Sequence, residues 1–154
     1  MWETVPRLLA QHRYLVLGTA DAEGRPWATP VFYAADGEHR VFWVSSADSR
    51  HSRNISARPA VAITIFDSHA PVGEAEAIYL EATAEPVSND AVAAAVERLN
   101  ARLPVSHRLG PEKIAPAGPM RVYQAIITQH FVLIRGGDAR FGRDVDTRLA
   151  VTPP

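Results

Sequence analysis

The sequence contains no cysteine among its 154 residues. This absence excludes disulfide bonds, a cysteine nucleophile and any metal site built from thiolates. The formal net charge is only −1, and no basic run is interleaved with aromatic side chains. We therefore expect no nucleic-acid partner and no attraction to an acidic membrane surface. The six histidines are dispersed, with neither a His-x-His nor a His-Glu-x-x-His spacing, so we expect no metal site.

Long apolar segments are missing as well. No run approaches the roughly 20 residues that a transmembrane helix needs. The N-terminal stretch MWETVPRLLAQHRY carries Glu3, Arg7 and Arg13 and lacks the apolar centre of a signal peptide. Neither a Gly-Lys-Ser/Thr phosphate loop nor a Gly-x-Ser-x-Gly nucleophile motif occurs. These absences predict a cytoplasmic protein that does not enter a membrane.

The chain does contain a succession of β-forming segments. Hydrophobic residues make up 47% and charged residues 21%, which is typical of one soluble domain covering residues 1–154. The tight turns AEGRP and ADGEHR join the first three segments, a pattern that predicts a meander. Pro30 indicates an edge strand or a bulge, and the last strand is expected to bend near residues 128–129. The six predicted strands cover residues 14–21, 27–34, 40–46, 60–66, 77–87 and 120–135.

Helices are predicted between these strands, over residues 4–13, 48–58 and 88–103. Residues 104–119 are rich in proline and are expected to form a loop, and residues 137–154 form a polar tail. A meander of this kind tends to close on itself, because open strand edges invite pairing with other chains. The predicted fold is therefore mainly β (α+β), a small six-stranded antiparallel barrel with flanking helices.

Hydroxyl groups and cations gather where the third predicted strand passes into the second helix, in the stretch WVSSADSRHSRNISARP. An anion such as a phosphate needs charge-assisted donors, and the planar fork of Arg50 suits its oxygens. The start of a helix near Ser49 adds free N–H groups and a favourable dipole. A nearby phosphate would also raise the pKa of His51. The alternative is that the serines only cap the helix while the arginines are solvated.

The order of these segments resembles the FMN-binding split-barrel family that includes pyridoxamine 5′-phosphate oxidase. Two hairpins precede an aromatic strand in YLVLGTADAEGRPWATPVFYAADGEHRVFWVSS, and a Ser-Arg pair opens a helix in SRHSRNISARPAVAI. The segments RVYQAIITQHFVLI and FGRDVDTRLAV are similar to the family's late strand and tail. The oxidases read Ser-Arg-Lys where this chain has Ser49, Arg50 and His51. The tail also lacks the Arg-x-His pattern of the oxidases, so we do not expect a true pyridoxamine-phosphate oxidase.

The resemblance implies a split β-barrel homodimer that holds FMN between its subunits. Ser49, Arg50 and His51 occupy the phosphate-binding places of the family. Further contacts to the cofactor are expected from the second and third strands and from the late strand. These are Thr29, Pro30, Val44, Ser45, Ser46 and Gln124.

The function expected from the resemblance is an FMN-dependent oxidoreductase that acts on an unidentified small molecule, with no assigned catalytic side chain. Two alternatives remain open. The first is a reductase that uses the deazaflavin F420 on the same fold, with Arg53 or Arg58 supplying cations for its longer acidic tail. The second is a non-catalytic protein that binds flavin or heme.

Overall fold

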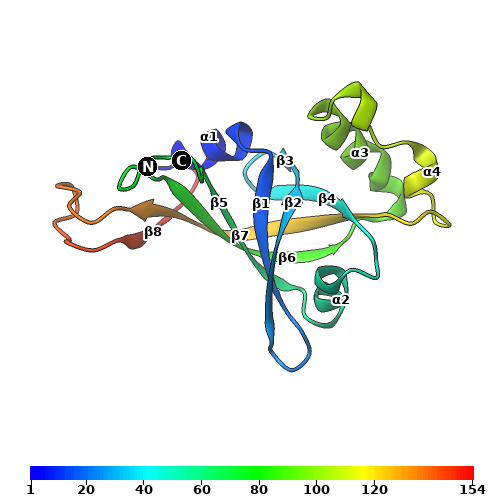
Figure 1. The fold of residues 1–154 in the computed structure, drawn as a ribbon, viewed down its shortest axis with the longest axis horizontal. Coiled ribbons are helices and arrows are strands. Elements are labelled where there is room, and N and C mark those ends of the chain that lie inside the picture. The colour runs from blue at the N-terminus through cyan, green and yellow to red at the C-terminus, as the bar shows by residue number, and fades with distance from the viewer.

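A single curled antiparallel sheet dominates the computed structural model, which describes residues 1–154 (Figure 1). Its strands are β1 (Tyr14–Ala20), β2 (Pro26–Phe32), β3 (Ala34–Asp36), β4 (Arg40–Ser45), β5 (Ala60–Phe66), β6 (Ala77–Pro86), β7 (Arg121–Ile134) and β8 (Thr147–Val151). The helices are α1 (Thr4–Gln11), α2 (Arg50–Ala57), α3 (Val92–Ala101) and α4 (Pro111–Ile114), with short 3₁₀ turns at Asn89–Ala91 and Val105–His107. No helix is both long and apolar enough to cross a membrane.

The sheet confirms the mainly β, antiparallel half-barrel with flanking helices, but it has eight strands rather than six. One additional strand is β3, the short arm of the hairpin that turns at Gly37, where φ is +60°. The other is β8, which comes from the segment predicted to be a tail. β7 is much longer than β4, so its second half leaves an edge exposed, and β8 pairs with this edge.

The predicted meander of the first three strands is wrong. The strand order is β2-β1-β5-β6-β7-β4-β3, so β2 pairs only with β1, while β4 lies between β7 and β3. The chain therefore passes from one edge of the sheet to the other across a single residue, Tyr33. Tyr33 is fully buried, and its hydroxyl donates to the carbonyl of Leu9 at 2.8 Å. Because the sheet curls, β2 and β4 come into contact although they share no ladder.

Two local predictions about the strands are confirmed. Pro30 lies on β2, which is an edge strand, so its missing N–H leaves no gap in a ladder. The bend in β7 is a β-bulge: Glu81 pairs with Gln129 and Ala82 with Ile127, which leaves Thr128 as the extra residue. The Thr128 hydroxyl donates to the carbonyl of Glu81 at 3.1 Å and fixes the bulge.

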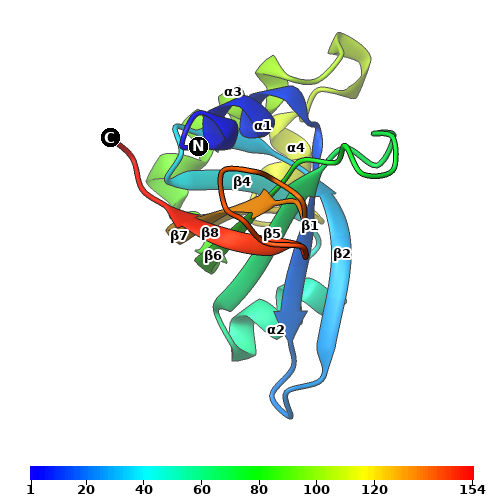
Figure 2. The ribbon, with the colours of Figure 1, turned by 90° about the vertical axis from the view of Figure 1, so that its left-hand side faces the viewer.

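The inward-facing side chains of the sheet form one large core. Trp43 of β4 is fully buried there and stacks on its cross-strand neighbour Tyr123, with 5.8 Å between the ring centroids. Helices α1 and α2 lie at opposite ends of the curled sheet, as Figures 1 and 2 show, and each adds apolar side chains to this core. Helix α3 instead packs on the outer face near β3 and β4, around Phe42 and Leu99. The end of β4 and the start of α2 are thereby held at one end of the barrel.

Candidate functional site

The N-terminus of α2 offers two unused backbone donors. Ser49 is the N-cap, and its side chain accepts a hydrogen bond from the amide of Ser52 at 3.3 Å. The amide of Arg53 donates to the Ser49 carbonyl at 3.0 Å. The amides of Arg50 and His51 have no acceptor in the structure. Together with the positive end of the helix dipole, these two N–H groups favour a bound anion.

Arg50 lies beside these amides with its charge uncompensated. Its side chain is exposed and takes part in none of the molecule's ion pairs. The guanidinium lies over the indole of Trp27, 4.3 Å from the ring centroid. Trp27 belongs to β2 and is 41% exposed, so the cation is held at the surface rather than drawn into the core.

The sequence reasoning missed Trp27. Trp27 lies between Pro26 and Pro30, and prolines in a strand are typical of a sheet edge. A tryptophan at a sheet edge is less often part of the core, and this pattern could have identified Trp27 as a site residue. Its contact with Arg50 depends on the placement of α2 against β2, which no spacing along the chain reveals. Trp27 therefore enters the site as a residue that positions Arg50.

His51 joins the helix to β4. Its Nε2 lies 2.7 Å from the buried Ser45 hydroxyl and 3.3 Å from the Ser49 hydroxyl. Burial lowers the pKa of His51. The imidazole is therefore neutral near pH 7 in the absence of a bound anion, and it becomes a cationic ligand only when an anion favours its protonation.

The three serines of this region differ in what they still offer. The Ser49 hydroxyl caps the helix and contacts the Ser46 carbonyl and the Ser52 hydroxyl, so it is already used within the protein. Ser45 contacts His51. The Ser46 oxygen accepts from the amide of Asp48 at 3.1 Å, and its own O–H has no acceptor. Ser46 is thus the serine whose hydroxyl is free to donate to an external oxygen.

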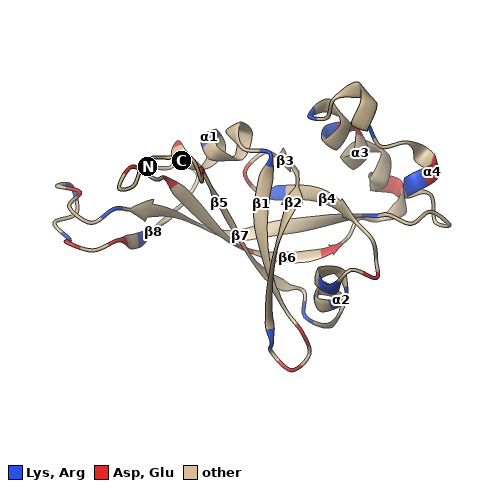
Figure 3. Ribbon diagram, in the orientation of Figure 1, with Lys and Arg blue, Asp and Glu red and all other residues tan.

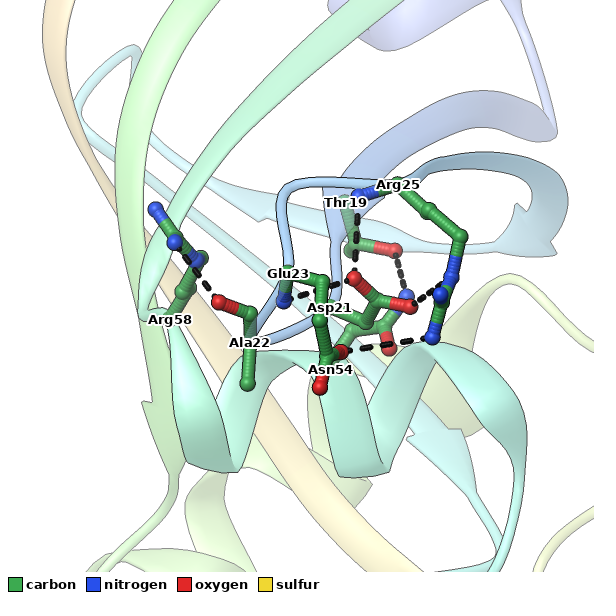
Figure 4. A network of polar contacts seen from close by, with 7 residues as sticks. All are labelled: Thr19, Asp21, Ala22, Glu23, Arg25, Asn54 and Arg58. Carbon is green, nitrogen blue, oxygen red and sulfur yellow. Dashed lines mark hydrogen bonds and ion pairs between the residues drawn. The ribbon is translucent and has the colours of Figure 1, made fainter.

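The C-terminal end of the same helix is bound to the β1–β2 hairpin, as Figure 4 shows. Arg58 donates to the carbonyl of Ala22 at 2.8 Å, and the buried amide of Asn54 donates to the Thr19 hydroxyl at 3.0 Å. At the hairpin tip, Asp21 accepts from both the backbone and the side chain of Arg25. A rise of 1.5 Å per residue places Arg58 about 12 Å from Arg50, so it does not add to the cationic site.

The other predicted residues do not all reach this cluster. Thr29 faces inward beside the buried Leu17, whereas Pro30 points to the outer face of β2. Val44 also points outward, where it packs near α3. Gln124 pairs with Phe42, three residues before Ser45, so it lies about 10 Å along the strand from that serine.

Gln124 and two of the five histidines outside the cluster, His130 and His69, lie apart from it. The Gln124 amide donates to the Glu85 carboxylate at 3.0 Å. His130 is buried, with Nε2 2.6 Å from the carbonyl of Glu38, and so faces neither solvent nor a cleft. His69 lies on the surface with its side chain 95% exposed. No group of three or more side chains that ligate metals is present.

Comparison with known proteins identifies relatives of this chain. A family model described as pyridoxamine 5′-phosphate oxidase matches residues 1–131. No curated protein matches the sequence.

Solved structures share the fold at low sequence identity. The heme storage protein HutZ from Vibrio cholerae aligns with a TM-score of 0.69 at 20% identity, over 84% of this chain and 92% of its own. A heme binding protein from Mycobacterium smegmatis aligns with a TM-score of 0.73 at 20% identity, over 96% of this chain and 57% of its own. An F420 reductase aligns with a TM-score of 0.61 at 23% identity, over 80% of this chain and 93% of its own.

Proposed function

The chain belongs to the pyridoxamine 5′-phosphate oxidase family, and from this premise we propose that it is an FMN-binding oxidoreductase acting on a small molecule. The observation that carries the proposal is the group of unused donors at the start of α2. Arg50 has no acidic partner, the amides of Arg50 and His51 have no acceptor, and the Ser46 hydroxyl is free to donate. A phosphate with nearly two negative charges satisfies all of these groups together.

Each residue of the site has a defined part in this proposal. Arg50 binds the phosphate through its planar fork, and Trp27 keeps the guanidinium at the helix start. His51 takes up a proton when the phosphate raises its pKa, which adds a second cation. Thr29 and Pro30 belong to β2 and Val44 and Ser45 to β4, and the rest of the cofactor is proposed to lie along these two strands, which contact each other. The flavin supplies the hydride chemistry, and the protein binds it, orients it and excludes water.

We further propose that the protein is a homodimer with the cofactor at the subunit interface. The strands β1, β2 and β5 carry no charged residue, and Figure 3 shows their ribbons in tan. Their outer face holds a cavity of about 920 Å³ over small residues such as Gly18, Ala28 and Ala62. Tyr14 and Phe66 on the same face are 63% and 44% exposed. Glu81 of the neighbouring β6 is the one charged residue that lines this cavity. A largely apolar face of this extent is typical of a subunit interface.

The dimer is tested by its mass in solution. Sedimentation or light scattering should give twice the chain mass for the wild type. Ala28→Arg places a charge on the β2 part of this face and should give monomers. Ala94→Arg is the matched control, because Ala94 is exposed on α3 away from that face. A wild-type protein that is monomeric at all concentrations would refute the dimer.

The cofactor is tested by spectral titration of the purified protein. FMN should bind near one per chain, and its fluorescence should change on binding. F420 is the second candidate, favoured by the fold shared with an F420 reductase, and heme is the third, favoured by the two heme proteins of the same fold. Titration with all three ligands ranks their affinities directly. A protein that takes up no FMN would overturn the proposal.

Oxidoreductase activity needs a separate measurement. The FMN-loaded protein should oxidise NADH or NADPH when an artificial electron acceptor is present. Loaded protein that shows no turnover with either donor would instead indicate a binding or storage protein. This result would leave the cofactor assignment intact and remove only the enzymatic part.

A further inference from the structure

A separate cavity of about 820 Å³ lies between α3, α4 and the start of β7. Figure 1 shows these elements together at one end of the molecule, on the outer side of the sheet. The cavity walls are mostly aliphatic side chains and prolines, among them Val92, Val96, Leu109, Ile114 and Pro111. Both its volume and its apolar walls are typical of small-molecule sites.

Arg121 is the only charged residue that lines this cavity. Three carbonyl groups hold its guanidinium in place: Nη1 donates to Gly118 and Met120 at 2.7 and 2.9 Å, and Nη2 donates to Pro116 at 2.8 Å. Arg121 takes part in no ion pair, and no acidic side chain lines the cavity. Its Nε–H and one N–H of Nη2 have no acceptor. The cavity therefore combines an apolar body with one fixed positive charge.

We propose that this cavity binds a small molecule with an apolar body and a single anionic group, such as a carboxylate or a sulfonate. The apolar walls remove the hydrocarbon part from water, and Arg121 pairs with the anionic group. A dianion or a polar sugar would leave its polar groups without partners against the aliphatic walls. The site does not depend on the proposed cofactor.

The cavity lies near the end of β4 that leads into α2. In the β4–β7 ladder, Arg121 pairs with Ser45 and Val122 pairs with Val44. The cavity therefore lies close to the end of β4 from which the chain continues into the cationic cluster at α2. A ligand in this cavity is placed beside the proposed cofactor site, which suits a substrate or an effector of that site.

Two fluorescent dyes that differ only in charge test the proposal. 1-Anilinonaphthalene-8-sulfonate carries one sulfonate, and N-phenyl-1-naphthylamine is the same ring system without it. Both should bind wild-type protein with increased fluorescence, and the sulfonate should bind more tightly. Arg121→Gln should weaken the sulfonate about tenfold and leave the uncharged dye nearly unchanged, because one charge-assisted interaction is lost. Equal weakening of both dyes would overturn the role of Arg121.

A second pair of variants locates the dyes. Ala93 lines the cavity, whereas its exposed neighbour Ala94 does not. Ala93→Trp should fill the cavity and weaken both dyes by about tenfold or more. Ala94→Trp should leave both affinities unchanged. If Ala93→Trp has no effect, the dyes bind elsewhere, such as the outer face of β1, β2 and β5, and the proposal fails.

The charge preference is also tested without altering Arg121, in case Arg121→Gln fails to fold. Added salt should weaken the sulfonate dye in the wild type and leave the uncharged dye unaffected. If both dyes bind equally well at low salt, the anionic part of the proposal is refuted.

Discussion

The two ends of helix α2 both carry an arginine, but the surroundings of the two arginines differ. At the C-terminal end, Arg58 donates to the carbonyl of Ala22, and Asn54 joins the helix to Thr19 (Figure 4). At the N-terminal end, Arg50 has only the face of Trp27 as a partner, and two backbone amides beside it lack acceptors. One end is satisfied within the protein, whereas the other retains donors for a ligand.

This difference shows why a count of basic residues does not locate an anion site. Arg53 and Arg58 are exposed, as Arg50 is, yet their guanidinium groups donate to the carbonyls of Asp48 and Ala22. What distinguishes Arg50 is the absence of any such acceptor. The function of each end is therefore decided by unsatisfied hydrogen bonds rather than by charge alone.

The largest effect is expected from Arg50→Ala. Loss of a charge-assisted pair of hydrogen bonds should weaken FMN binding about a hundredfold. Arg58→Ala is the matched control and should keep the wild-type affinity within about twofold. Quenching of FMN fluorescence measures both constants. Equal losses in the two variants would show that the two ends of α2 do not differ in function.

Asn54→Ala should separate stability from binding at the satisfied end of the helix. The substitution leaves the buried Thr19 hydroxyl without its donor, which costs about 1–3 kcal/mol in the free energy of unfolding. Urea denaturation of the wild type and the variant measures this difference. The FMN affinity of the folded variant should not change, and a large loss of affinity would contradict a purely structural role.

Trp27→Ala should produce a smaller loss of affinity than Arg50→Ala. An exposed cation–π contact contributes about 0.5–1 kcal/mol, so FMN should bind about two- to fivefold more weakly. Trp27→Phe retains an aromatic face and should recover part of this loss. In the wild type, a phosphate that binds to Arg50 changes the surroundings of the Trp27 indole and should change the tryptophan emission. An emission spectrum that FMN and inorganic phosphate leave unaltered in shape would argue against the coupling.

The smallest effect is expected on the pH dependence of the free energy of unfolding, to which His51 contributes. Burial lowers the pKa of His51 in the folded protein from the ordinary value of 6.5. As the pH falls below 6.5, the imidazole is therefore protonated in the unfolded chain before it is protonated in the folded chain. The free energy of unfolding of the cofactor-free protein should therefore decrease as pH falls through this window. His51→Asn should show a weaker dependence over the same range in parallel urea titrations. If the two slopes are the same, His51 is not the group responsible.

Most of the fold follows from local patterns in the sequence. The six predicted strands appear with boundaries shifted by one or two residues, and the helix at Ser49 begins at its cap as expected. The strand that pairs with β4 was not predictable in this way. A short link between two strands has the same sequence pattern whether the strands pair or not. Here Tyr33 links β2 and β3, which lie at opposite edges of a curled sheet.

The candidate site was only partly predictable. Ser45, Ser49 and His51 come together because a strand end and a helix start are close in sequence. Arg50 lies with them, but its contact with Trp27 joins residues 23 positions apart. Gln124 was included as a polar residue in an apolar strand, and its contact with Glu85 of β6 is likewise decided only by the pairing of the strands.

The sequence by itself determined the strands, the helix starts and the concentration of hydroxyls and cations after β4, because propensity, capping and turn formation act over a few residues. Only the tertiary structure decided which donors remain free, which arginine is used within the protein, and that a single arginine faces an apolar cavity. These properties depend on acceptors supplied by distant segments, and the curling of the sheet determines which segments meet.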